Sequence, residues 1–152
     1  MNKQDFIAMM QRVQAPLVNM IEMIPEDKLD FRPADNFMTI GHLLKHFSEN
    51  WSLVAMLYKG EWPDMSPEQM AEMMKLENME SMTKAEALEA MKKDLDDAVA
   101  FIENEISDEE FLNKDVSAPW GFQGKMWQGI GMAYDHQSNH KMQLHLYLKM
   151  LG

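Results

Sequence analysis

The sequence contains no cysteine among its 152 residues. A chain without cysteine forms no disulfide, no thiolate metal site and no cysteine nucleophile, so any thiol that takes part in its chemistry comes from another molecule. Positive charge is also scarce, because 14 lysine and arginine residues stand against 25 acidic ones and give a formal charge of -11. Since this balance lacks the basic stripe of nucleic-acid-binding proteins, we expect DNA and RNA not to be partners.

Long apolar runs are missing as well. No window approaches the roughly 18 apolar residues of a membrane span. Gln4, Asp5 and Arg12 interrupt the apolar residues of segment 1–14, which therefore lacks a signal-peptide core. We expect a cytoplasmic protein without membrane contact. At 46% hydrophobic and 26% charged residues, the composition is that of a globular protein, and we expect residues 1–152 to form one domain.

Four segments carry apolar residues at the three- and four-residue spacing of amphipathic helices. This pattern predicts an all-α fold, a four-helix bundle with antiparallel helices and one long crossover. Pro16 lies inside the first helix and predicts a kink there, while Thr83 and Glu86 form a capping box for the third. The expected helices cover about residues 6–24, 39–60, 83–106 and 126–150, with loops at 24–38 and 113–124.

The histidines carry the chemistry of this sequence. In the fourth helix, His136 and His140 fall in the apolar arc, and a spacing of four residues puts both rings within reach of one metal ion. In the second helix, His46 lies at the flank of the apolar arc, whereas His42 lies further out, and His145 projects to the polar side of the fourth helix. Buried histidines that bond neighbouring polar groups are the ordinary alternative. The pattern alone leaves both interpretations open.

Three runs carry a resemblance to a family. Thr39-Ile-Gly-His-Leu-Leu-Lys-His46-Phe resembles the second-helix motif of the DinB-like (DinB/YfiT) superfamily of bacterial proteins, whose last histidine is a metal ligand. Segment 135–152 is similar to the closing motif, which supplies two histidines four residues apart, and segment 24–33 is similar to the link between helices one and two. The resemblance implies a metal site made of His46, His136 and His140. In segment 139–143 the residues on either side of His140 depart from the family pattern, whereas His140 itself matches it.

Relatives in this superfamily are thiol-dependent transferases and an isomerase, and some resemble hydrolases. The resemblance therefore implies a metal-dependent transferase that uses a low-molecular-weight thiol, or a hydrolase, with a small-molecule substrate. Three histidine ligands leave coordination positions open, as in catalytic sites, and imidazole suits zinc, nickel, iron or copper. The alternative is a non-catalytic metal-binding or stress-related interaction module, and in either case we expect a homodimer.

Three further residues are candidates for catalysis or binding. Glu49 follows His46 by about one turn and is a candidate general base, while His42 is a candidate proton shuttle. Arg32 is one of two arginines and is a candidate partner for an anionic thiol. The ordinary alternatives are a solvated carboxylate, a partly exposed ring and a surface ion pair.

The segment 61–82 differs from the helices in composition. It contains two prolines and many methionines, and Ser66-Pro67-Glu68 predicts the start of a short extra helix. Because methionine adapts to varied shapes, this segment is either a flexible apolar cover over the metal site or core filling. The four tryptophans are either pocket lining or packing; they are Trp51, Trp62, Trp120 and Trp127.

Overall fold

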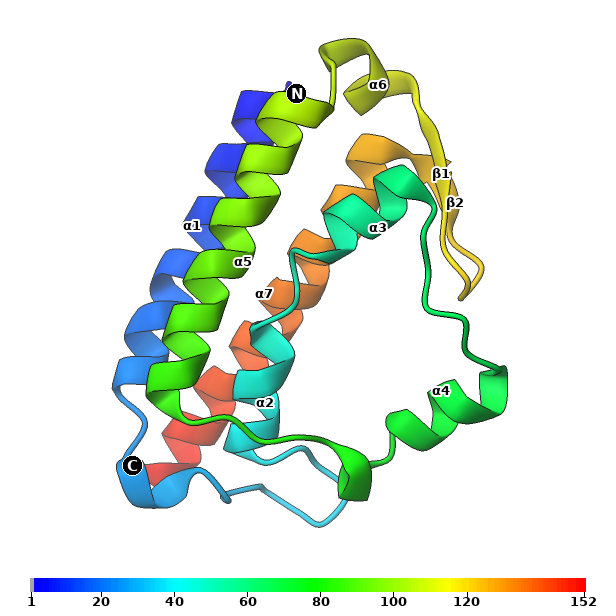
Figure 1. The fold of residues 1–152 in the computed structure, drawn as a ribbon. Helices are drawn as coiled ribbons and strands as arrows, with labels where there is room; N and C mark the ends of the chain where they lie inside the picture. The colour runs from blue at the N-terminus through cyan, green and yellow to red at the C-terminus, as the bar shows by residue number, and fades with distance from the viewer. Residues whose placement is uncertain (1) are drawn as a thin grey trace.

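The computed structural model describes residues 2–152, apart from the side chain of residue 67. Three long helices form the frame: α1 (Lys3–Glu22), α5 (Lys84–Glu105) and α7 (Met126–Leu151). Two short helices, α2 (Ile40–Phe47) and α3 (Leu53–Lys59), form the fourth column. As Figure 1 shows, α1 and α7 run in one direction and α2, α3 and α5 in the other, so the chain between α3 and α5 returns along the bundle. The predicted helical bundle with a long crossover is confirmed.

The helices begin at residues that cap them. Asn2 and Asp5 form a capping box at α1, and Thr83 and Glu86 form the predicted one at α5, so side chains satisfy backbone N–H groups that the first turn leaves free. α1 continues across Pro16 as one helix, because the proline removes one hydrogen bond while the apolar face on both sides stays buried. None of the described helices is long and apolar enough to cross a membrane.

The prediction of one continuous second helix is wrong, because the chain breaks between Ser48 and Ser52. The Ser48 hydroxyl donates to a backbone carbonyl three residues earlier, at 2.6 Å, and so competes with the helical hydrogen bonds. On α5, the Asp94 carboxylate accepts the backbone N–H of Trp51 at 2.6 Å and that of Ser52. This carboxylate fixes the turn from which α3 starts. The break also places Asn50 inside the bundle, where only 6% of it is exposed.

The connections contain more structure than the loop at 113–124 that we expected. A short helix α6 (Asp108–Asn113) leads into an antiparallel hairpin of β1 (Asp115–Ser117) and β2 (Gln123–Lys125), which pairs Val116 with Gly124. In the crossover, α4 (Pro67–Met73) is the predicted short helix, and Ser66 and Gln69 form its capping box. Two single 3-10 turns, η1 (Glu26–Lys28) and η2 (Leu76–Asn78), complete the chain.

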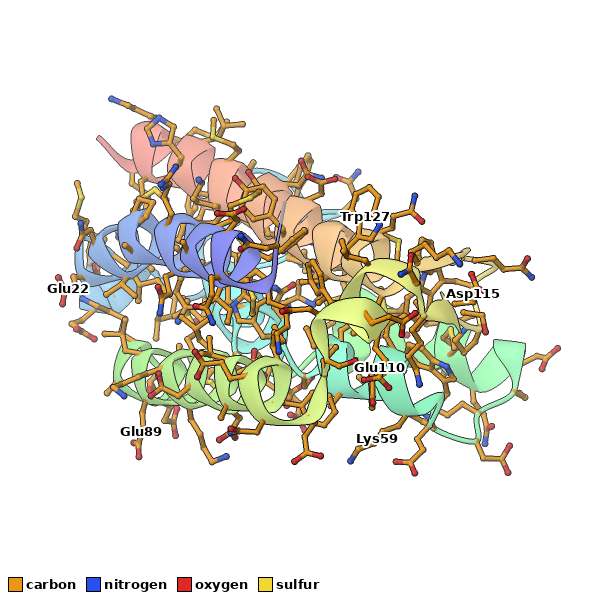
Figure 2. All side chains as sticks on the ribbon, turned by 90° about the horizontal axis from the view of Figure 1, so that it is seen from above. Glu22, Lys59, Glu89, Glu110, Asp115 and Trp127 are labelled. Carbon is orange, nitrogen blue, oxygen red and sulfur yellow. The ribbon has the colours of Figure 1, made fainter. Side chains whose placement is uncertain are left out.

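The core consists of two apolar clusters with a polar layer between them. On α7 the first cluster ends at Ala133 and the second begins at Leu144, and His136 and His140 lie in this interval. The buried polar side chains fall at the same level on α1, in the break between α2 and α3, and on α7, and they are Gln14, Ser48, Asn50 and Gln137. Charged side chains point outward instead, as Figure 2 shows for Glu89 and Lys59 in a view along the bundle. The sequence therefore concentrates its buried polar groups around the candidate site.

Candidate metal centre

The structure brings together the three histidines of the predicted metal site. One ring nitrogen of each of His46, His136 and His140 lies within 4.8 Å of the others, the one such group of metal-binding side chains in residues 2–152. The Nε2 atoms of His46 and His136 are 2.9 Å apart. For zinc–nitrogen bonds of about 2.0–2.1 Å, two ligands of a tetrahedral ion lie about 3.4 Å apart. Small side-chain rotations thus suffice for all three rings to bind one ion.

Asn50 holds the ring of His136. The Asn50 amide nitrogen donates to the carbonyl of Ala133 at 3.1 Å, so its oxygen faces the Nδ1 of His136, which lies 2.8 Å away. Since an amide oxygen only accepts hydrogen bonds, Nδ1 carries the proton and Nε2 keeps a free electron pair. Such a contact on the far side of the ring is typical of histidines that bind metals.

A similar chain of hydrogen bonds holds His140. The Tyr147 hydroxyl donates to the carbonyl of Met38 at 3.1 Å and accepts the amide N–H of Gln143 at 2.8 Å. The Gln143 oxygen therefore faces the Nδ1 of His140, at 2.9 Å, and accepts its proton. His140, like His136, is left with its Nε2 electron pair free for a ligand bond.

The surroundings favour the neutral form of His46 and His136. Burial of the ring, together with the neighbouring His140 and His136, lowers the pKa of His46 to about 4, although Glu49 acts in the opposite sense. Burial and the neighbouring His140 also lower the pKa of His136. Neutral imidazole is the form that binds metals. Three imidazole nitrogens, with the Nε2 electron pairs of His136 and His140 left free, therefore fit a divalent transition-metal ion.

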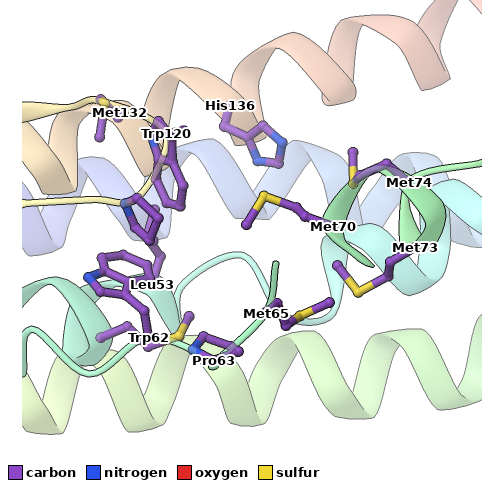
Figure 3. A pocket seen from close by; sticks show the side chains of 12 residues that line it. Leu53, Trp62, Pro63, Met65, Met70, Met73, Met74, Trp120, Met132 and His136 are labelled. Carbon is purple, nitrogen blue, oxygen red and sulfur yellow. The ribbon is translucent and has the colours of Figure 1, made fainter. Parts of the chain in front are cut away.

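Three cavities adjoin the histidines. The largest, about 570 Å³, touches His136 and is otherwise lined by apolar side chains, several of which Figure 3 shows around it. A second cavity of about 350 Å³ touches His46 and contains charged groups, and a third of about 320 Å³ touches all three histidines. Methionines from residues 61–82, which we call the cover segment, line all three. The cover segment thus lies over the site, in agreement with the first of the two predicted interpretations.

Comparison with known proteins identifies the family. The sequence matches the DinB family over residues 1–152. The chain belongs to the DinB family. No similar protein was found among proteins of curated function.

Solved structures confirm the DinB-like fold. A DinB-like protein of Bacillus cereus ATCC 10987 has a TM-score of 0.77 at 11% sequence identity, and the match covers 98% of this chain and 92% of that one. The DinB-like protein YjoA of Bacillus subtilis has a TM-score of 0.70 at 17% identity, with 97% and 92% of the two chains covered. At such low identities the similarity establishes the fold alone.

A third structure corrects one of our expectations. The colibactin self-resistance protein ClbS, crystallised in complex with dsDNA, has a TM-score of 0.68 at 18% identity, and the match covers 97% of this chain and 96% of that one. A protein of this fold therefore binds DNA. Our expectation that DNA and RNA are not partners was wrong. It rested on the net charge, which describes the whole surface, whereas a DNA contact uses only part of that surface.

The other predicted site residues lie around the three-histidine cluster without joining it. His42 and Glu49 line the charged cavity beside His46, where the His42 Nδ1 accepts the backbone N–H of Thr39 in the capping box of α2. Burial and the charge of Arg32 lower the pKa of His42. Arg32 itself pairs with Asp35 at 3.2 Å and lines none of the three cavities.

Two residues that hold the ligands, Asn50 and Gln143, were not recognised from the sequence. Asn50 follows His46 by four residues and Gln143 follows His140 by three, which are spacings that bring side chains together on a helix. In this structure only the spacing between His140 and Gln143 brings the two side chains together. Asn50 reaches His136 because the chain breaks before α3 and turns the amide toward α7, and the contribution of Asp94 to that break is not visible in a helical pattern.

Proposed function

We propose that this DinB-family protein is a metal-dependent transferase that joins a small thiol to an apolar electrophilic substrate. The observation that carries the proposal is the position of the three histidines between cavities of different chemistry. A reaction between two dissimilar molecules needs two such spaces, which meet where the bond forms. A hydrolase needs one substrate cavity and access for water.

The larger cavity suits the electrophile. Its volume of about 570 Å³ lies within the range of small-molecule sites, which is about 300–1,000 Å³. The wall consists of methionine, tryptophan, proline and leucine side chains, and His136 is the polar residue among them. An apolar substrate bound there presents one end to the histidines.

The charged cavity suits the thiol. Lys45, Glu49 and Glu80 line it beside His46, with Asn78 on the cover segment. Lys45 bonds Glu49 and lies 3.6 Å from Glu80, so the cation is already neutralised by carboxylates. This arrangement favours a thiol that carries an amino group over a purely anionic one.

Each residue of the centre has a separate role in this reaction. His46, His136 and His140 would hold the ion, while Asn50 fixes the tautomer of His136 and Gln143 fixes that of His140. A divalent ion such as zinc, nickel or iron would supply Lewis acidity that lowers the pKa of a thiol beside it. Glu49 lines the cavity next to His46 and is placed to take up the thiol proton.

A hydrolase is the second candidate, because the same Glu49 can act as the general base that takes a proton from water. The test is turnover by protein loaded separately with zinc, nickel or iron. A transferase consumes chlorodinitrobenzene only when a thiol such as cysteine is added, forming the carbon–sulfur bond and releasing chloride. A hydrolase cleaves nitrophenyl acetate without any thiol.

His46→Ala should abolish turnover, while His145→Ala, which changes a histidine outside the cluster, should retain it. Metal-loaded protein that is inactive with both substrate types would favour a non-catalytic metal-binding module instead. Because ClbS was crystallised with dsDNA, a titration with duplex DNA belongs beside this screen.

A further inference from the structure

We infer that the cavity beside His136 selects uncharged aromatic molecules, with the charged and the purely polar ones excluded. That such a molecule is the substrate rests on the proposed function, whereas the prediction that it binds in this cavity does not. The inference comes from three properties of the cavity wall, namely its charge, its aromatic corner and its sulfur atoms.

The first property is the absence of charge. Of the side chains described around this cavity, all but His136 are apolar, and none carries a carboxylate, ammonium or guanidinium group. Moving an ionised group from water into such a space is unfavourable unless a partner charge is present. Any ligand that fills the cavity is therefore uncharged there, and its one polar group meets the ring of His136.

The second property is an aromatic corner made by two loops. Trp62 follows α3 and Trp120 lies in the turn between β1 and β2, and their rings meet edge to face with centroids 5.1 Å apart. Figure 3 shows both rings at one end of the cavity, away from Met73 and Met74. Trp120 is 55% exposed, so apolar ring surface is available to a ligand. A planar ring can add to this edge-to-face arrangement.

The third property is the row of thioethers on the cover segment. Met70, Met73 and Met74 line the cavity opposite Met132 of α7, and Met73 and Met74 are 53% and 55% exposed. Methionine sulfur makes favourable contacts with the edges of aromatic rings, and its flexible chain adapts to ligands of different outline. Exposed methionines beside an empty apolar space thus favour an aromatic ligand that covers them.

Two fluorescent probes with one carbon skeleton test this inference. N-phenylnaphthylamine is neutral, and anilinonaphthalenesulfonate is its anionic counterpart. We expect the neutral probe to bind at one site, roughly tenfold more tightly than the anion, in a fluorescence titration of the full chain.

Charge introduced into the wall should reverse this preference. Met132→Lys should weaken the neutral probe about tenfold and strengthen the anionic one. Met74→Lys changes an exposed side chain, which the fold tolerates, and should shift both affinities in the same directions by a smaller factor. Met142→Lys is the matched control, because Met142 is exposed on the same helix as Met132 but outside the cavity.

The outcomes separate this inference from the proposed function. His46→Ala should still bind the neutral probe although it loses metal and turnover, because His46 does not line this cavity. Equal binding of both probes, or loss of the neutral probe in Met142→Lys rather than in Met132→Lys and Met74→Lys, would overturn the inference. Metal-dependent thiol transfer restricted to polar electrophiles would overturn it too, together with the apolar electrophile of the proposed function, but would leave the thiol-transferase reaction in place.

Discussion

The two walls of the histidine site are built in different ways. The inner wall consists of α2, α3, the turn between them and α7. His136 donates a hydrogen bond to Asn50, His140 donates one to Gln143, and Gln143 donates one to Tyr147. The outer wall is the cover segment, in which α4 stands apart from the bundle in Figure 1 and presents exposed methionines. One wall has fixed polar contacts and the other has flexible apolar ones.

This difference assigns the two walls to different tasks. Metal ligands need fixed orientation, and helices packed in a core supply it through contacts around each ring. A surface that receives molecules of varied shape needs side chains that adapt, and methionine supplies these at small cost to the core. Changes in the inner wall should therefore alter stability and metal binding, whereas changes in the cover segment should alter substrate binding alone.

The largest expected effect is on the stability of the inner wall. Trp51 is fully buried, and its indole N–H donates to the Gln14 amide oxygen at 3.0 Å. Trp51→Ala should lower the free energy of unfolding by about 3–5 kcal/mol, measured by urea denaturation followed by circular dichroism. Met73→Ala, in the cover segment, should change it by less than about 0.5 kcal/mol. Similar losses in both variants would mean that the cover segment belongs to the core.

The next effect is on the metal affinity. Asn50→Ala and Gln143→Ala should each weaken metal binding about 10- to 100-fold while the three ligands stay, because the rings lose the acceptors of their Nδ1 protons. Competition with a chelator measures this affinity. Asn139→Ala changes an exposed neighbour of His140 and is the control. Unchanged affinity in all three variants would separate the hydrogen bonds from the metal site.

A smaller effect concerns pH and the turn that places Asn50. Burial raises the pKa of Asp94 from 3.8 to about 6, against the opposing hydrogen bonds from the N–H groups of Trp51 and Ser52. Between these two pKa values the folded chain binds more protons than the unfolded one, so stability falls as the pH rises from about 4 to about 6. Because Asp94 is only partly buried, we expect about 1–2 kcal/mol.

Unfolding measured at pH 4 and at pH 6.5 in wild type and in Asp94→Asn tests this expectation. The asparagine keeps an acceptor for the backbone but does not titrate, so the fall should be smaller in the variant. Asp96→Asn, which changes an exposed carboxylate paired with Lys92, should behave like wild type in this window. An identical pH dependence in the wild type and Asp94→Asn would show that this carboxylate does not contribute.

The smallest expected effect tests the cost of the polar layer. The Gln137 side chain is 1% exposed, and neither its oxygen nor its nitrogen has a hydrogen-bond partner among the described residues. Gln137→Met removes these unpaired polar atoms at similar length and should raise the free energy of unfolding by about 1 kcal/mol. A clear loss of stability would mean that the amide has a partner, such as an internal water.

The sequence predicted those parts that depend on periodic patterns. Apolar spacing and capping residues predicted the long helices, and the four-residue spacing of His136 and His140 placed both rings on one face toward α2. The break before α3 was not predictable in this way, because it depends on Asp94, which is about 40 residues away in the chain and contacts the turn only after α5 has packed. The hairpin before α7 was missed because its strands are very short.

The orientation of the histidine rings could not be predicted from the sequence for the same reason. Whether Nδ1 or Nε2 of His136 carries the proton follows from the carbonyl that Asn50 bonds on α7, and that contact needs the folded bundle. The motifs that resemble the DinB family pointed to the three clustered histidines, whereas the hydrogen bonds that orient two of their rings came from the structure.

Metal content, measured by elemental mass spectrometry, tests the central claim most directly. The samples are the wild-type protein, His140→Ala and His145→Ala after dialysis against zinc, nickel or iron, with circular dichroism to check the fold. We expect about one equivalent of one metal in wild type and in His145→Ala, and its loss in folded His140→Ala. A folded wild type that takes up none of the three metals, or a His140→Ala variant that retains a full equivalent, would contradict it.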